Sequence, residues 1–358
     1  MSANDPLIDF VSAVSGDGFL KVEETLGDGY VRLRVSEAER RQAKHDIRSF
    51  EDIVVELLRN ARDAHARRIF VATVRDSANR FMTVVDDGVG VPSALHAAIF
   101  DPRVTSKLET MVMDRWGVHG RGMALFSIKT NASVARIAAS APHKGAAINV
   151  VVDAGTLSER ADQSTWPVVE PGEDGAPHVV RGPHNIVRRL VEFGCEHPAV
   201  EVYYGTPTEV LATLYELGRR ALDASDLMFC DDLDHLPVWE RPAAAADAND
   251  LTEVADSIGL PVSERTAHRI LAGELAPLEP VLMQVMGAEA PEPEPAPDIY
   301  RDRRSLRLHH SDLAAFRSQL TTVFDSLGER YYLSLRGEPK ITVTRDAITV
   351  RFLIDKDD

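Results

Sequence analysis

A short stretch near residue 56 places a carboxylate beside a carboxamide. Glu56 and Asn60 are four residues apart, so they share one face of a helix, and Asp63 lies beside Asn60 three residues further on. Oxygen ligands of this kind hold a hard cation, and a carboxylate can take a proton from a water molecule. For one such pair taken alone, an ordinary solvated polar stripe is the better explanation.

A second stretch joins an acidic residue to two glycines. Asp86, Gly88 and Gly90 follow an apolar run in the pattern D-x-G-x-G. Glycines allow a turn that a flat ligand can approach closely, and the Asp86 carboxylate can accept hydrogen bonds from an amino group such as that of adenine. Taken alone, an ordinary hairpin turn explains this pattern about as well.

A third stretch is rich in glycine and precedes a predicted helix. Gly117, Gly120 and Gly122 could let successive backbone N–H groups point at phosphate oxygens, aided by the helix N-terminus. Lys107 could add a positive charge at a terminal phosphate. The stretch is not a Walker A loop, which needs Gly-Lys-Ser/Thr together, and no Rossmann glycine pattern follows a strand.

These residues need a sheet and helices to bring them together. Helical spacing predicts a helix over residues 50–65, capped by Ser49, a short helix near 93–100 and another from about 122. Alternating or apolar runs predict strands at 30–35, 68–74, 80–86, 133–140 and 146–152. Helices among hairpin-like strand pairs predict an α+β fold, with a mixed sheet and helices on one face.

The rest of the chain reads as a loop, a helical segment, a linker and a small C-terminal piece. Residues 158–184 are polar and rich in Pro and Gly, which predicts a long loop. Alternating Pro and Glu predict a semi-rigid linker after the helical segment. The last 59 residues contain patterns for one helix and three strands. We therefore divide the chain into residues 1–206, 207–287 (helical), 288–299 (linker) and 300–358 (small α/β domain).

Composition limits the class of protein. The net charge of −16 argues against a chain that coats nucleic acid over its whole surface, although a local basic face is compatible with it. No apolar run approaches the length of a membrane span, and the acidic N-terminus does not resemble a secretory signal. Two cysteines cannot make a disulfide scaffold, so we expect a cytoplasmic protein without membrane contact.

The three stretches in this order are improbable by chance. Together they resemble the GHKL ATPases (gyrase B, HSP90, histidine kinase, MutL), whose ATP pocket is the Bergerat fold, over about residues 30–155. The resemblance implies ATP and Mg²⁺ as cofactors, with Glu56 as the general base that activates water and Asn60 as the Mg²⁺ ligand. It further implies that Asp86 reads the adenine amino group while Gly88 and Gly90 make room for the base.

The same resemblance implies a lid over the triphosphate, formed by residues 101–123. The residues that it would bring to the nucleotide, besides Asp63, are Thr105, Ser106, Lys107, Gly117, Val118, His119, Gly120, Arg121, Gly122 and Met123. One departure concerns the adenine contact. Members of the family commonly have Gly-Thr before a late strand, whereas the best match here is Gly145-Ala146, without a hydroxyl.

Glu56 argues against the histidine-kinase branch, which typically replaces this acid, and two hydrolysing branches stay open. Residues 105–108 and 121–128 resemble the lid of MutL. The glycine run, with residues 182–190 and 197–202, is similar to topoisomerase VI B, which is the ATPase component of topoisomerase VI.

A helical stretch further on bears on the same choice. Asp250–Gly273 is similar to the helix-two-turns-helix insert of topoisomerase VI B, and the alternative is any helical hairpin packed on the ATPase domain. Residues 243–298 hold 11 acids and two arginines, Arg265 and Arg269. DNA contact there would be weak and would need both arginines on one face.

In both branches a transducer domain sends a lysine back to the γ-phosphate. After Lys144 the only lysines are Lys340, which opens a predicted strand, and Lys356, in an acidic tail. Lys340 is the candidate, although a surface lysine at a strand start is the simpler explanation.

The sequence therefore predicts a nucleotide-gated clamp that hydrolyses ATP and forms a homodimer on binding Mg·ATP. It is most like a reduced topoisomerase VI B, whose partner would be topoisomerase VI A, the DNA-cleaving component. A MutL- or MORC-like ATPase of DNA repair or silencing is the alternative among enzymes. A nucleotide-sensing adaptor without significant turnover is the alternative outside them.

Overall fold

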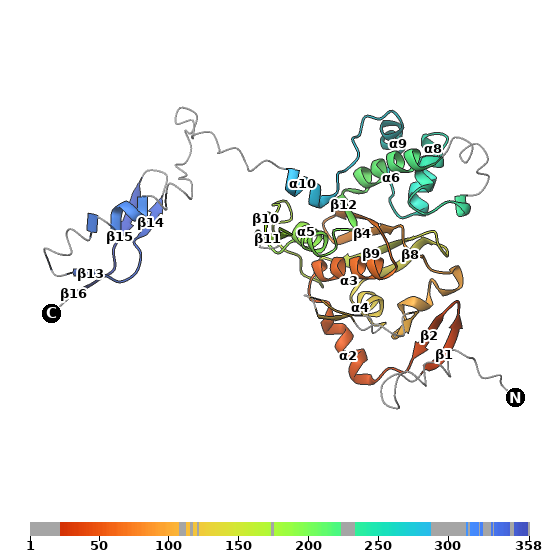
Figure 1. Ribbon diagram of the computed structural model, residues 1–358, viewed down its shortest axis with the longest axis horizontal. Helices are drawn as coiled ribbons and strands as arrows, with labels where there is room; N and C mark the ends of the chain where they lie inside the picture. The colour runs from red at the N-terminus through yellow and green to blue at the C-terminus, as the bar shows by residue number, and fades with distance from the viewer. Residues whose placement is uncertain are drawn as a thin grey trace. The chain divides into compact units, whose positions relative to one another are not determined.

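The computed structural model divides the chain into two compact units, Met1–Ala288 and Glu289–Asp358 (Figure 1). The described residues are 22–106, 112–114, 117–119, 122–172, 175–222, 233–287, 313, 316–321, 323–324, 331, 333–343 and 347–356. For 112–114, 117–119, 287 and 356 only the backbone is described.

A five-stranded mixed sheet forms the centre of the first unit. Its strand order is β12(Glu201–Gly205), β3(Arg68–Arg75), β4(Asn79–Asp86), β9(Ala146–Asp153), β8(Val134–Ser140). Strands β3, β4, β9 and β8 pair antiparallel, whereas β12 runs parallel to β3. The predicted mixed sheet is confirmed, and β12 extends it by an edge strand that the sequence patterns did not indicate.

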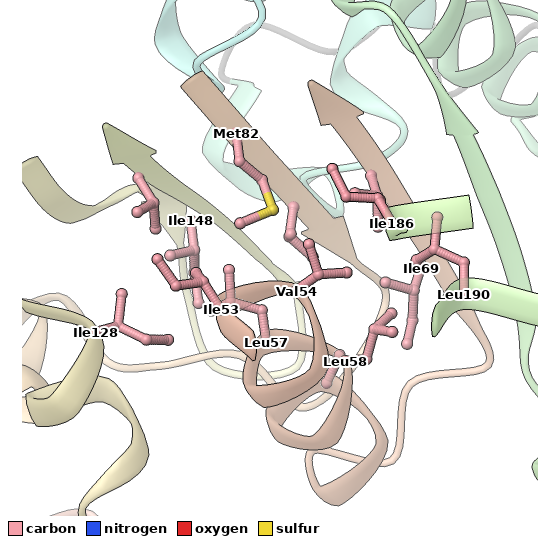
Figure 2. Packing of buried hydrophobic residues seen from close by; sticks show 14 of the residues in the cluster. Ile53, Val54, Leu57, Leu58, Ile69, Met82, Ile128, Ile148, Ile186 and Leu190 are labelled. Carbon is pink, nitrogen blue, oxygen red and sulfur yellow. The ribbon is translucent and has the colours of Figure 1, made fainter. Parts of the chain in front are cut away.

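Helices α3(Phe50–Asp63), α4(Ala124–Asn131) and α5(Ile186–Glu196) cover one face of the sheet. Figure 2 shows their apolar side chains against strand residues; it labels Ile53, Val54, Leu57, Leu58, Ile128, Ile186 and Leu190 on the helices and Ile69, Met82 and Ile148 on the sheet. The helical spacing of the α3 residues gives one continuous buried stripe. Burial of each such side chain stabilises the fold by about 1.5–3 kcal/mol. The helix that carries Glu56 and Asn60 is therefore anchored in the core.

The other face of the sheet packs on the helical segment. Phe70, Val85 and Ala147 form a second core with α6(Pro207–Ala221), α8(Ala248–Ser257) and α9(Glu264–Leu271). Thr83 of β4 also donates a hydrogen bond to the Gly259 carbonyl in the α8–α9 turn, at 2.6 Å. The α8–α9 hairpin therefore packs on the strands that carry Asp86 and Ala146.

Two predicted elements need correction. Residues 93–100 form two 3-10 turns, η2(Ser93–Leu95) and η3(Ala98–Phe100), in place of one helix. The predicted loop 158–184 contains a hairpin of β10(Val168–Pro171) and β11(Pro177–Arg181). Val169 and Val179 on these strands are partly buried and pack against the main core. These contacts stabilise the two strands, although the surrounding Pro and Gly residues had predicted a loop.

Smaller elements complete both units. The first unit also contains β1(Val22–Gly27), β2(Tyr30–Leu33) and β5(Val104–Thr105), which form one sheet, the β6(Val112–Asp114)–β7(Gly117–His119) hairpin, α2(Glu37–Asp46), η4(Leu233–His235), η5(Arg241–Ala244) and α10(Val281–Gly287). In the second unit, β13(Leu333–Leu335) pairs with β16(Ile354–Lys356), and β14(Lys340–Val343) pairs with β15(Ile348–Arg351). Among the described residues, no helix has both the length and the hydropathy needed to cross a membrane.

Candidate functional site

A cavity of about 760 Å³ lies in the first unit and is lined by α2, α3, β4, β5, β9 and the start of α4. It is large enough for a nucleotide-sized ligand. Of the residues predicted for the site, those that line it are Glu56, Asn60, Asp63, Asp86, Gly90, Thr105, Ser106, Gly122 and Met123. Residues separated by more than 60 positions in the sequence thus reach one cavity.

Asp86 closes β4 with a nearly buried carboxylate. The residue is only 5% exposed. Its Oδ1 accepts a hydrogen bond from the Gly88 N–H at 2.9 Å. Asp86 lies directly opposite Ala146 of β9, and both line the cavity. The residue beside the acid is therefore an alanine, without a hydroxyl, as the Gly145-Ala146 alignment predicted.

Asp87, the neighbouring acid, holds the backbone. Its Oδ1 accepts hydrogen bonds from the N–H groups of Arg67 and Arg68, at 2.7 and 2.9 Å. It does not line the cavity in the described part of the chain. Two adjacent aspartates therefore have different surroundings, and Asp86 is the one that a ligand can reach.

The glycines near Asp86 are required by close packing of the backbone. A Cβ on Gly90 (φ +68) would lie 2.0 Å from the Ala141 carbonyl, and one on Gly145 (φ +75) would lie 2.0 Å from the Asp86 carbonyl. A Cβ on Gly88 would meet the Ala64 carbonyl at 2.6 Å. Gly88 is not among the described lining residues. Its lack of a Cβ lets the turn pack against Ala64 at the end of α3.

Glu56, Asn60 and Asp63 lie along α3 and all line the cavity. Glu56 Oε1 accepts a hydrogen bond from Arg59 Nη1 at 2.7 Å, and Asp63 pairs with Arg62 at 2.8 Å. The Asn60 Nδ2 atom is buried and has no hydrogen-bond partner among the described residues. The amide can be turned so that either its oxygen or its nitrogen takes this position.

This donor set fits Mg²⁺. The Asn60 amide, whose Nδ2 position has no hydrogen-bond partner among the described residues, lies on the cavity wall with the Glu56 and Asp63 carboxylates. These groups offer oxygen ligands, which hard cations prefer. No cluster of three His, Cys, Asp or Glu side chains able to hold a metal occurs in the described part of the chain. A site with few protein ligands is typical of Mg²⁺, which keeps waters and binds substrate phosphates.

The start of α4 forms the remaining wall. The helix begins at Ala124 after Met123, whose side chain makes no capping bond, and the first residues of the helix line the cavity. The N–H groups of a helical first turn have no partners within the helix and attract anions. Gly122 (φ +65) accepts a hydrogen bond from the Arg103 N–H at 2.8 Å, which joins the two ends of the predicted lid.

Part of the predicted lid lies outside the described residues, namely Lys107, Gly120 and Arg121. Gly117, Val118 and His119, part of the glycine-rich run predicted to contact phosphates, form strand β7, which pairs with β6. Lys340 is exposed at the start of β14 in the second unit. Arg265 and Arg269 are exposed on α9, and Arg269 pairs with Glu274 at 3.1 Å.

Tyr30 and Arg59 are among the residues of the cavity wall that the sequence analysis did not predict. Tyr30 lines the cavity from β2, and burial raises the pKa of its phenol, partly offset by a hydrogen bond from the Ser106 side chain. In the sequence, the only signal at this position was the alternating pattern that predicted a strand at 30–35. Arg59 also lines the cavity, and its place between Glu56 and Asn60 on the predicted helix was the signal available.

Comparison with known families identifies this region. A family model described as "Histidine kinase-, DNA gyrase B-, and HSP90-like ATPase" matches residues 45–156. The chain contains a GHKL ATPase domain. The match spans α3, the turn after β4 and the start of α4, so the predicted family and the predicted α+β fold are confirmed. GHKL ATPase domains bind ATP, typically with Mg²⁺, and the domain supports ATP binding and ATPase activity in general. A search of curated proteins finds no match to this chain.

Proposed function

We propose that the cavity binds Mg·ATP and that Glu56 activates the water that attacks the terminal phosphate. The observation that carries this proposal is that Asp86, Glu56, Asn60 and the first turn of α4 line one and the same cavity. These groups supply the chemistry that a purine nucleotide needs: an acceptor for an amino group, oxygen ligands for a cation and N–H donors for phosphates. A polar stripe or a hairpin turn alone would not bring them together.

Each group has one task in this proposal. Asp86 accepts a hydrogen bond from the adenine amino group. Asn60 would hold Mg²⁺, which would supply positive charge beside the phosphates. The first turn of α4 binds phosphate oxygens through its N–H groups. Glu56 takes the proton from the attacking water, a contribution of about 10²–10⁴-fold in rate.

We further propose that ATP gates the dimerisation of a clamp, most like a reduced topoisomerase VI B acting in DNA topology. The α8–α9 hairpin supports this comparison because it occurs where topoisomerase VI B carries its helix-two-turns-helix insert. Lys340 is the candidate for the lysine that a transducer domain brings to the γ-phosphate. The expected partner is a DNA-cleaving protein like topoisomerase VI A. Co-elution of the two purified proteins tests that assignment, and a failure to associate would favour a MutL- or MORC-like clamp.

Steady-state ATP hydrolysis by wild type and Glu56→Gln tests the catalytic proposal. We expect Glu56→Gln to bind ATP as wild type does and to lose at least 100-fold in kcat, in line with the loss of a general base of about 10²–10⁴-fold. Equal rates would remove Glu56 from catalysis. Tight ATP binding by wild type with no turnover would indicate a nucleotide-sensing adaptor.

A further inference from the structure

A nearly buried arginine lies beside the proposed base. The side chain of Arg59 is 3% exposed and that of Glu56 is 20% exposed, and Arg59 Nη1 donates to Glu56 Oε1 at 2.7 Å. The two residues are three positions apart on α3, so they lie on neighbouring turns of one helix. Both line the cavity. The pair therefore belongs to the cavity wall.

We propose that Arg59 is a positioning residue that fixes the carboxylate of Glu56 in the orientation needed to activate water. This inference rests on the proposed function of Glu56. The guanidinium is a planar, permanently charged donor, and a charge-assisted bond of this length is stronger than one between neutral groups. Burial of the arginine removes its freedom to follow the carboxylate. Glu56 is thereby held by a partner that is itself fixed by the core.

Glu56 differs in its partner from another glutamate of the same helix. The bond from Arg59 is made to Oε1 of Glu56, and an ionised carboxylate has about four acceptor positions. A second carboxylate on the same helix is held by neutral donors. Glu51 Oε1 accepts hydrogen bonds from the Arg160 N–H and the Gln163 side chain, at 2.9 and 2.7 Å. The cationic partner is thus a feature of the glutamate that lines the cavity.

Two effects of Arg59 on the rate oppose each other. A nearby cation makes a carboxylate a weaker base, which lowers the rate of proton transfer. Loss of orientation is the larger effect, because a displacement of a reacting group by about 1 Å can cost about 100-fold in rate. We therefore expect removal of Arg59 to lower kcat by about 10–100-fold, within the range that general-base catalysis contributes. The KM for ATP should stay within about twofold, since the interaction acts on the base.

Four variants of the full-length chain test this inference by steady-state ATP hydrolysis and calorimetric titration with a non-hydrolysable ATP analogue. Arg59→Met removes the charge at similar length, and Arg59→Lys keeps a cation without the planar fork. Glu56→Gln reports the base itself. Arg188→Met is the matched control, because Arg188 forms a comparable pair with buried Glu192 at 2.8 Å on α5, outside the described cavity lining.

We expect Arg59→Met to bind the analogue as wild type does and to lose about 10–100-fold in kcat, and Arg59→Lys to regain part of that loss. Arg188→Met should lose thermal stability without this loss of kcat. A kcat in Arg59→Met at or above the wild-type value would overturn the inference, as would a loss confined to nucleotide affinity or an Arg59→Lys variant that binds the analogue but is no faster than Arg59→Met. If Glu56→Gln hydrolyses ATP at the wild-type rate, the proposed function fails instead, whatever the Arg59 variants do.

Discussion

At the scale of single residues, the adjacent Asp86 and Asp87 should differ in their effect on ATP binding. Asp86→Asn should abolish ATP binding, because an amide cannot accept from the adenine amino group in the same geometry. It would also leave buried polar groups unpaired, at a cost of about 1–3 kcal/mol or more. Calorimetric titration with a non-hydrolysable ATP analogue measures this effect directly.

Asp87→Asn is the matched control for that titration. Its carboxylate accepts two backbone N–H groups, so this variant should lower the free energy of unfolding while the surviving folded protein still binds ATP. Wild-type affinity in Asp86→Asn, or an equal loss in both variants, would remove Asp86 from the assigned role.

At the scale of elements, the turn before β9 supports the Asp86 backbone. Gly145→Ala combines a left-handed backbone, which costs a residue other than glycine about 1–2 kcal/mol, with a Cβ placed 2.0 Å from the Asp86 carbonyl. Relief of the overlap should cost about 1–3 kcal/mol more and displace Asp86, so ATP affinity should fall. Urea denaturation and calorimetric titration measure the two losses.

Gly273→Ala separates the backbone cost from the overlap. Gly273 has φ +70, similar to Gly145, but an added Cβ would meet no atom within 4 Å. This variant should show only the backbone cost and unchanged ATP affinity. Equal effects of the two substitutions would contradict the account of the turn.

The α8–α9 hairpin gives a prediction for DNA. Its apolar face packs on the sheet, while Arg265 and Arg269 are exposed in a strongly acidic part of the chain. Duplex binding through them should be weak and fall steeply with salt, and reversal of both arginines to glutamate should erase it in a fluorescence anisotropy titration. Binding that persists unchanged would place the DNA surface elsewhere.

How far the sequence predicts these elements depends on how local their causes are. Helix α3 follows from its apolar period and from Asp52, whose carboxylate accepts the Ser49 N–H at 2.9 Å, so Glu56 and Asn60 could be placed on one face from spacing alone. The β10–β11 hairpin could not be predicted in this way, because its valines pack against core residues that are distant in the sequence. Spacing indicates that Arg59 can reach Glu56 on the helix, but the bond between them depends on side-chain rotamers. The role of Gly88 depends on the approach of Ala64, which spacing does not encode.

At the scale of the whole molecule, we expect the bound nucleotide to control association of the chains. Glu56→Gln should keep ATP and Mg²⁺ binding but stop proton abstraction, so ATP would stay bound and unhydrolysed. A clamp that pairs while ATP is bound would then accumulate as a dimer. Wild type should dimerise on addition of Mg·ATP and return to monomer as ATP is consumed.

Light scattering after size exclusion, with and without Mg·ATP, is the measurement that tests this claim most directly. We expect a lasting dimer of Glu56→Gln with Mg·ATP, a monomer of Glu56→Gln without it, and a transient dimer of wild type with Mg·ATP. Asp86→Asn should stay monomeric in both conditions, since it should not bind the nucleotide. If Glu56→Gln binds ATP yet stays monomeric, the nucleotide site stands and the clamp is contradicted; if it hydrolyses ATP at the wild-type rate, the assignment of Glu56 is contradicted.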